Sequence, residues 1–198
     1  MLELKAAREQ NLSPNPTLLT QQDALFMPRP LLYDISSLDL TKVQISGEEI
    51  RAVNPQRFEF EQLDSIAYFN PQEEIAVGTR TLDENEFWTR GHMPGRPVFP
   101  GVLMLEAAAQ LCSFYTSTVA GTEKVFGFGG ADDIRFRRML SPGDTLHLLA
   151  KPESISLRRS LFKTQGVVDG QLAFEASILG IALPPAIEEG KNGGEAGI

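Results

Sequence analysis

The sequence predicts an α+β domain in which a curved antiparallel sheet of about six strands wraps round one long central helix. Three observations lead to this fold class. Segments rich in β-branched and aromatic residues recur along the 198-residue chain, turn signals separate several of them, and one long helical segment is apolar over nearly its whole circumference. A helix of that kind must be covered on all sides, and a curled sheet covers it.

The central helix is predicted from about Gly101 to Val119, because Pro100 is a natural entry residue and Gly121 a natural stop. Its polar residues form one narrow stripe, at positions i, i+4, i+7 and i+11 of the helix: Glu106, Gln110, Ser113 and Ser117.

A short helix is expected between Ser46, which can cap it, and Asn54-Pro55, which would stop it. Residues 64–69 and 73–82 then read as an antiparallel hairpin. After the central helix the strand pattern returns in five segments, with Pro142-Gly143 and Asp169-Gly170 as turn signals: residues 124–130, 133–140, 145–157, 160–170 and 171–183.

Composition divides the chain and excludes several classes of function. Residues 1–44 are expected to be an N-terminal extension, partly disordered or extended, residues 45–183 the folded domain, and residues 184–198 a flexible tail. A net charge of -8 argues against nucleic acid or anionic membrane as partner. One cysteine and an N-terminus without an apolar leader favour a cytoplasmic location, and no apolar segment approaches the roughly 20 residues of a membrane span.

The stretch GHMPGRPVFPGVLMLEAAAQ, residues 91–110, carries the candidate chemistry. Burial of a carboxyl group favours its neutral form, so Glu106 is a candidate general acid, and Gln110 can hold it from one turn later. Taken alone, the pair could equally be a satisfied polar spot in the core or at a subunit contact.

His92 lies in the Gly- and Pro-rich loop before the helix, where it is a candidate base because histidine exchanges protons near neutral pH. His147, in a strand, is expected to be structural. The Gly101 amide at the helix start could stabilise a developing negative oxygen, because glycine lets a ligand approach closely. A base, an acid and such an amide are the groups needed to remove water from a 3-hydroxyacyl thioester.

Residues 91–110 resemble the signature of the FabZ-type 3-hydroxyacyl-[acyl-carrier-protein] dehydratases. The resemblance extends to NPQRFEFEQLDSI upstream and to GGADDIRFRRMLSPGD and VVDGQLAFEASI downstream. It implies a hot-dog fold, with His92 as base, Glu106 as acid, the Gly101 amide on the thioester carbonyl and Gln110 supporting the acid. It also implies no metal or organic cofactor.

The same resemblance implies an acyl carrier protein as partner and a homodimer whose protomers share each active site, commonly assembled into a trimer of dimers. FabA-type relatives carry aspartate where this chain has Glu106, which favours dehydration without isomerisation. The chain departs from the FabZ pattern at Gln56, Phe58 and Met93, which leaves acyl-chain preference open.

Two basic clusters are candidate docking sites for an acidic carrier protein: Arg135, Arg137 and Arg138, and Arg158 and Arg159. The alternative is that Arg135 and Arg137 alternate outward from a strand simply for solubility. Two other functions remain open on the sequence: a hot-dog acyl thioesterase, and a non-catalytic subunit of a dehydratase oligomer.

Overall fold

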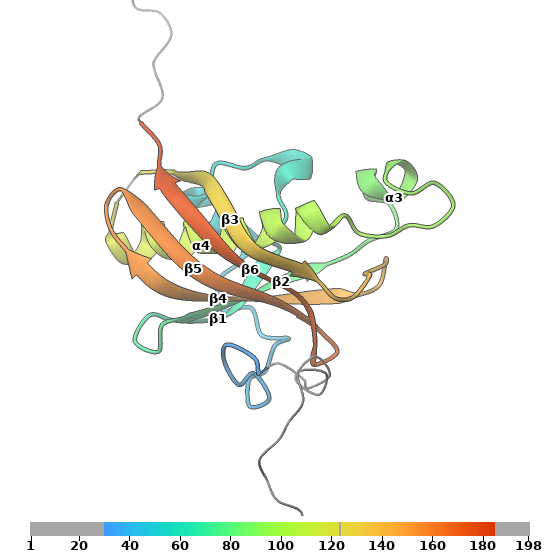
Figure 1. Cartoon of the computed structure of the whole chain (residues 1–198), viewed down its shortest axis with the longest axis horizontal. Helices are drawn as coiled ribbons and strands as arrows, with labels where there is room; N and C mark the ends of the chain where they lie inside the picture. Colours follow the sequence, from blue (N-terminus) through green and yellow to red (C-terminus); the bar gives the residue numbers. More distant parts are fainter. Residues whose placement is uncertain (1–29, 123, 185–198) are drawn as a thin grey trace, which may run out of the picture. The chain divides into compact units, whose positions relative to one another are not determined.

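Six antiparallel strands in the order β1-β2-β4-β5-β6-β3 form one sheet in the computed structural model, which describes residues 30–122 and 124–184 (Figure 1). Their bounds are Ser65–Asn70 (β1), Ile75–Thr81 (β2), Phe126–Phe136 (β3), Thr145–Ile155 (β4), Arg159–Val168 (β5) and Gln171–Ala182 (β6). The predicted α+β class and strand number are confirmed.

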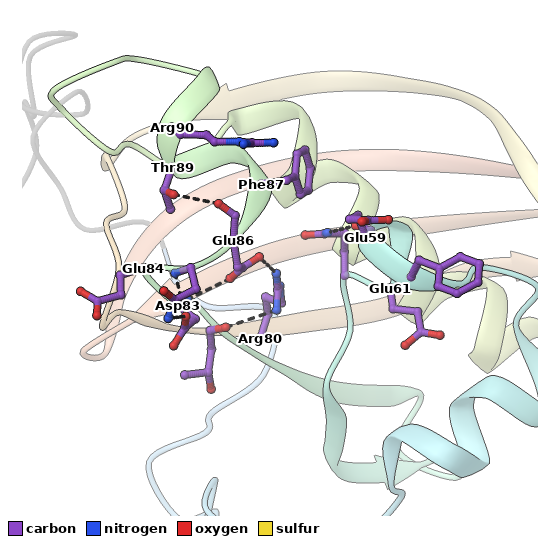
Figure 2. Close-up of a pocket in the computed structure, with 13 residues that line it drawn as sticks. Glu59, Glu61, Arg80, Asp83, Glu84, Glu86, Phe87, Thr89 and Arg90 are labelled. Carbon is purple, nitrogen blue, oxygen red and sulfur yellow. Dashed lines mark hydrogen bonds and ion pairs between the residues drawn. The ribbon is translucent and has the colours of Figure 1, made fainter.

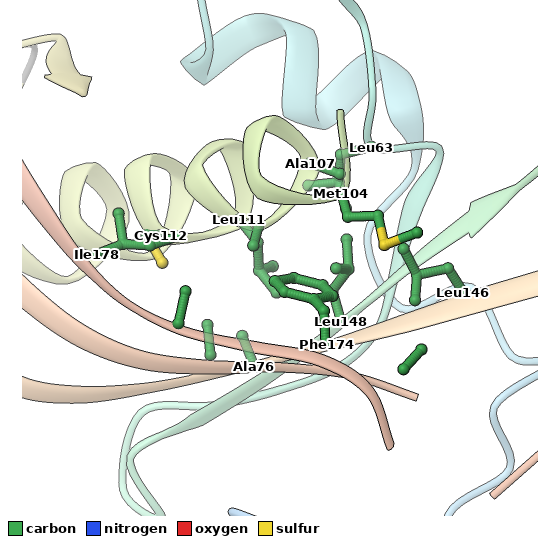
Figure 3. Close-up of a cluster of buried hydrophobic side chains, with 14 of the residues drawn as sticks. Leu63, Ala76, Met104, Ala107, Leu111, Cys112, Leu146, Leu148, Phe174 and Ile178 are labelled. Carbon is green, nitrogen blue, oxygen red and sulfur yellow. The ribbon is translucent and has the colours of Figure 1, made fainter. Parts of the chain in front are cut away.

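The central helix α4 spans Gly101–Ala120, within one residue of its predicted end. Pro100 precedes it in an extended conformation, and Gly121 ends it with a left-handed φ of 58°. The helix lies across the concave side of the sheet and packs against β2 to β6 (Figure 1). Its apolar side chains enter the main core with those of the strands (Figure 3), among them Met104, Leu111, Leu148 and Phe174.

The predicted turns at Pro142-Gly143 and Asp169-Gly170 are confirmed. Gly143 and Gly170 have φ of 93° and 72°, values that glycine adopts without strain, and Asp169 shares the left-handed region at 51°. The two segments expected at residues 124–130 and 133–140 are instead one strand, β3. Its pairing with β6 is irregular near Gly130 and Asp133. These irregularities interrupt the alternation of inward and outward side chains along the strand, so the sequence pattern predicts two strands instead of one.

Three short helical segments precede α4 in the chain. Helix α2 (Gly47–Val53) has the predicted cap: the Glu49 amide donates to the Ser46 hydroxyl, and the Glu49 carboxylate accepts from the Ser46 amide. The 3-10 turn η1 (Phe58–Phe60) and helix α3 (Phe87–Gly91) were not predicted, because each is shorter than two helical turns and leaves no periodicity to detect.

Residues 31–40 cover part of the outer face of the sheet. Ile35 is buried in a second apolar cluster with Val77, Leu149 and Val167, and the Leu32 amide donates to the Gln165 side chain at 2.8 Å. Of the expected extension the structure describes residues 30–44, and of the expected tail it describes residue 184. Residues 1–29 and 185–198 lie outside the described residues. The domain boundaries stay a prediction.

Candidate active site

The Gln110 side chain is fixed on three sides and turns its amide toward Glu106. Its Oε1 accepts from the Gln62 amide at 3.0 Å, and its Nε2 donates to the Phe60 carbonyl at 2.6 Å. Because those partners determine which end is oxygen, Nε2 is the group that donates to Glu106 Oε1, at 2.8 Å. The Asn54 side chain adds a bond to the Gln110 carbonyl at 2.9 Å.

Sequence reasoning paired Gln110 with Glu106 but missed the groups that hold Gln110. Gln62, Phe60 and Asn54 all come from the segment before β1. Gln62 and Phe60 use backbone groups and Asn54 bonds to a backbone carbonyl, so these contacts leave no residue-type pattern and only the fold reveals them. The single available signal was the resemblance of that segment to the family sequence.

Glu106 is half-buried at the wall of a cavity of about 180 Å³. Helix α4 forms one side of this cavity, and the start of β3, the end of β6, Ser160 of β5 and the pair Pro55-Gln56 after α2 form the rest. His92 of the same chain is not among the residues that line it. A single chain therefore supplies this cavity with the candidate acid and not with the candidate base.

His92 is exposed and lies at the C-terminal end of α3. Its Nδ1 is 2.8 Å from the Val98 carbonyl oxygen. A carbonyl can only accept, so Nδ1 carries the hydrogen and the neutral ring has its lone pair on Nε2. This bond orients the ring so that Nε2, the nitrogen that can accept a proton, points away from the loop.

Helix α3, which carries His92, is anchored by a charged cluster beside a cavity of about 680 Å³ (Figure 2). Glu86 accepts from the Trp88 indole at 3.0 Å and pairs with Arg80, which also pairs with Asp64 at 3.1 Å. Trp88 in turn packs edge-on against Phe99, just before α4. These contacts hold the His92 loop against the body of the domain.

Gly101 is the first residue of α4, and no side chain caps this end of the helix. The first amides of a helix have no carbonyl partner within it, so the Gly101 amide can serve a ligand. A Cβ at this position would lie 2.8 Å from Cζ of Phe136, the last residue of β3. The close approach that requires glycine here is therefore that of the Phe136 ring.

The five candidate docking arginines differ in their surroundings. Arg137 pairs with Glu175, and Arg138 pairs with Asp169 at 3.0 Å. Arg135 donates to the Ile134 carbonyl of its own strand. The remaining two, Arg158 and Arg159, are exposed at the turn between β4 and β5.

Two further groups have surroundings that oppose ionisation. Burial lowers the pKa of His147 and raises that of the Cys112 thiol.

Within residues 30–122 and 124–184 no group of three or more His, Cys, Asp or Glu side chains is arranged to hold a metal ion. In the same part of the chain no helix combines the length and apolarity of a membrane span.

Comparisons with known proteins agree with this architecture. The model of the FabA-like domain matches residues 54–177. The 3-hydroxyacyl-[acyl-carrier-protein] dehydratase FabZ of Neisseria meningitidis serogroup C is 38% identical over 144 residues, which are 70% of this chain and 94% of that protein. The FabZ of Desulfotalea psychrophila is 39% identical over 130 residues, 63% of this chain and 85% of its own. The FabZ-type resemblance found in the sequence is confirmed.

Solved structures support the fold at low sequence identity. The dehydratase heterocomplex ApeI:P from Xenorhabdus doucetiae matches with a TM-score of 0.59 at 10% identity, over 69% of this chain and 91% of that one. The thioesterase HI1161 from Haemophilus influenzae matches with a TM-score of 0.50 at 14% identity, over 64% and 82%. At such identities these structures bear on the fold alone, and they agree with the expected hot-dog fold. From its match to the family model over more than half its length, the chain belongs to the FabA-like family.

Proposed function

We propose that this protein is a dehydratase that converts (3R)-3-hydroxyacyl-[acyl-carrier protein] to trans-2-enoyl-[acyl-carrier protein] in fatty acid biosynthesis. The observation that carries the proposal is the Glu106 carboxyl group, held by Gln110 at the wall of a cavity large enough for part of an acyl chain. Curated relatives that match most of their length bear the dehydratase name, so a thioesterase is not favoured.

In this reaction His92 takes the proton from C2 of the substrate through Nε2, the nitrogen left free by the bond to Val98. Negative charge then develops on the thioester oxygen, where the Gly101 amide at the positive end of α4 stabilises it. Glu106 donates a proton to the 3-hydroxyl group, which leaves as water. The C2–C3 double bond forms from the electrons of the C2–H bond, and solvent returns a proton from His92 to Glu106.

The base and the acid of one site come from two protomers in this proposal. Two features support it: His92 does not line the cavity of Glu106 in its own chain, and its ring is exposed. A homodimer in which the partner's His92 faces Glu106 would complete each site. Assembly of such dimers into a trimer of dimers is part of the same proposal.

The acidic carrier protein would dock through arginines near the site. Arg158 and Arg159 are the better candidates, since part of the charge of Arg137 and Arg138 is neutralised by Glu175 and Asp169. Arg135 stays a candidate of the other cluster.

The test is hydration of a crotonyl thioester, the reverse reaction, followed by loss of the enoyl absorbance. Wild type should be active, and His92→Ala and Glu106→Gln should each lose about 10²- to 10⁴-fold in kcat. Glu153→Gln, an exposed acid on β4, is the matched control and should keep the full rate. An inert wild type, or full rate in both site variants, would overturn the assignment.

Mixing the two inactive variants tests the shared site. If each site combines His92 and Glu106 of different protomers, a mixed dimer contains one intact site, and random exchange restores about a quarter of wild-type activity. If both groups belong to one chain, mixing restores nothing.

A further inference from the structure

The 3-10 turn η1 supports Gln110 but is not itself held by buried side chains. Its Phe60 carbonyl accepts from the Gln110 side chain at 2.6 Å, and the backbone amide of Gln62, two residues later, donates to the same side chain at 3.0 Å. No residue of η1 is buried, and Phe58 and Phe60 are 86% and 65% exposed. Apolar packing of these residues therefore does not fix the turn.

The backbone of η1 is strained at its first residue. Phe58 has φ of 58°, in the left-handed region that a residue with a Cβ adopts only at a cost. Arg57, which precedes the turn, makes no capping bond with its side chain. A strained turn of this kind persists only when surrounding groups hold its conformation.

The Gln62 side chain is such a group. Its Nε2 donates to the Glu59 carbonyl, in the middle of η1, at 2.6 Å (Figure 2). Gln62 is 1% exposed, so its side chain reaches the turn from a fixed position in the interior. The Glu59 carbonyl belongs to the peptide group that joins Glu59 to Phe60. A bond to it therefore fixes the orientation of the residue whose own carbonyl Gln110 uses.

Stability alone does not account for a glutamine at position 62. The Oε1 of Gln62 is buried and has no hydrogen-bond partner within the described residues. A buried acceptor without a partner costs free energy, and an apolar side chain of similar size would avoid that cost. The bond from Nε2 to Glu59 is thus the contribution of Gln62 that an apolar residue could not supply.

We infer that Gln62 is a positioning residue, which acts on the reaction through η1, Gln110 and Glu106. The inference rests on the proposed dehydratase function and adds to it a residue that does not line the cavity of Glu106. The Gln62 amide and the Phe60 carbonyl determine which end of the Gln110 side chain faces Glu106. If η1 moves, Gln110 can turn its oxygen toward Glu106, and an oxygen cannot donate to a carboxylate.

The experiment compares crotonyl thioester hydration by wild type, Gln62→Leu and Gln62→Met. Both variants keep the backbone amide and a side chain of similar size but remove the donor to Glu59. We expect kcat to fall about 10-fold in each, with KM within about twofold of wild type, because the acid is misplaced and substrate binding is not. Full kcat in both variants would overturn the inference. Full kcat in Gln62→Met alone would overturn it as well, because the side chain would then only fill space.

Gln165→Leu is the matched control. Gln165 is also a buried glutamine, at 5% exposed, and its side chain accepts from the Leu32 amide on the outer face of the sheet. This variant should keep the full kcat, whatever its melting temperature. An equal loss of kcat in Gln165→Leu and in the Gln62 variants would show a general effect of lost stability and would refute the positioning role.

A double variant tests whether Gln62 acts through Gln110. Gln110→Leu removes the side chain that Gln62 positions, so adding Gln62→Leu should lower kcat by less than about twofold more. A further loss of about 10-fold would mean that Gln62 acts independently of Gln110, which contradicts the inference. Melting curves that show no folded state in both Gln62 variants would make the residue structural, with the same consequence. A wild type without crotonyl activity would overturn the proposed function instead.

Discussion

Replacing Gln110 by leucine removes three hydrogen bonds at once while keeping a side chain of similar size. The Gln62 amide and the Phe60 carbonyl lose their partner, and Glu106 loses the donor that holds its carboxylate. Gln62 is 1% exposed, so its amide would be left buried and unpaired, at a cost of about 1–3 kcal/mol. Phe60 is 65% exposed, so water can reach the vicinity of its carbonyl and the further cost is smaller. We expect Gln110→Leu to lower the free energy of unfolding by about 2–3 kcal/mol.

The same substitution should lower kcat, because a displaced acid protonates the leaving hydroxyl less well. A misplacement of about 1 Å can cost about 10²-fold, so a loss of about 10- to 100-fold in kcat is expected with KM changed less. Urea unfolding and crotonyl thioester hydration measure the two effects, and Gln171→Leu, an exposed glutamine of β6, is the control. If Gln110→Leu is destabilised and keeps full kcat, Gln110 is structural only. If neither the free energy of unfolding nor kcat changes, the three hydrogen bonds of Gln110 contribute neither to stability nor to catalysis.

Three further predictions concern other parts of the domain. Ile35→Ala should lower the free energy of unfolding by about 2–4 kcal/mol, because Ile35 fills the cluster on the outer face of the sheet, whereas Val43→Ala, at an exposed position, should change it by less than about 0.5 kcal/mol in urea unfolding. Reversing the charges of Arg158 and Arg159 to glutamate should weaken carrier-protein binding about tenfold at low salt and less at high salt, with Lys42→Glu as control; unchanged affinity would exclude this docking site. The pKa of His147 is lowered by burial, so the unfolded chain binds a proton more readily than the folded one, and stability is present above the ordinary histidine pKa of about 6.5 and is lost as pH falls below it. His147→Gln should reduce the loss in unfolding free energy between pH 7.5 and 5.5, and an equal loss in wild type and variant would contradict this account.

Much of the fold follows from local chemistry. The run of apolar residues between Pro100 and Gly121 can only be a buried helix, since its length exceeds a strand and its ends carry a helix-entry and a helix-stop residue. The turns at Gly143 and Gly170 are equally local, because their backbone conformations favour glycine. Local signals were weak in two places. Strand β3 was wrongly predicted as two segments, and the short helix α3 was not predicted.

For the site, the sequence by itself placed His92, Gly101, Glu106 and Gln110 in one stretch, and helical periodicity put Glu106 and Gln110 on one face of the helix. Only the tertiary structure decided how they are held. The orientation of Gln110 depends on the backbone before β1, and the free nitrogen of His92 depends on the Val98 carbonyl. The close approach at Gly101 depends on the Phe136 ring, and the cavity beside Glu106 depends on strands far along the sequence. These backbone groups and this cavity come from long-range packing, which no short stretch of residues encodes, and that packing fixes the position of the Glu106 carboxyl group.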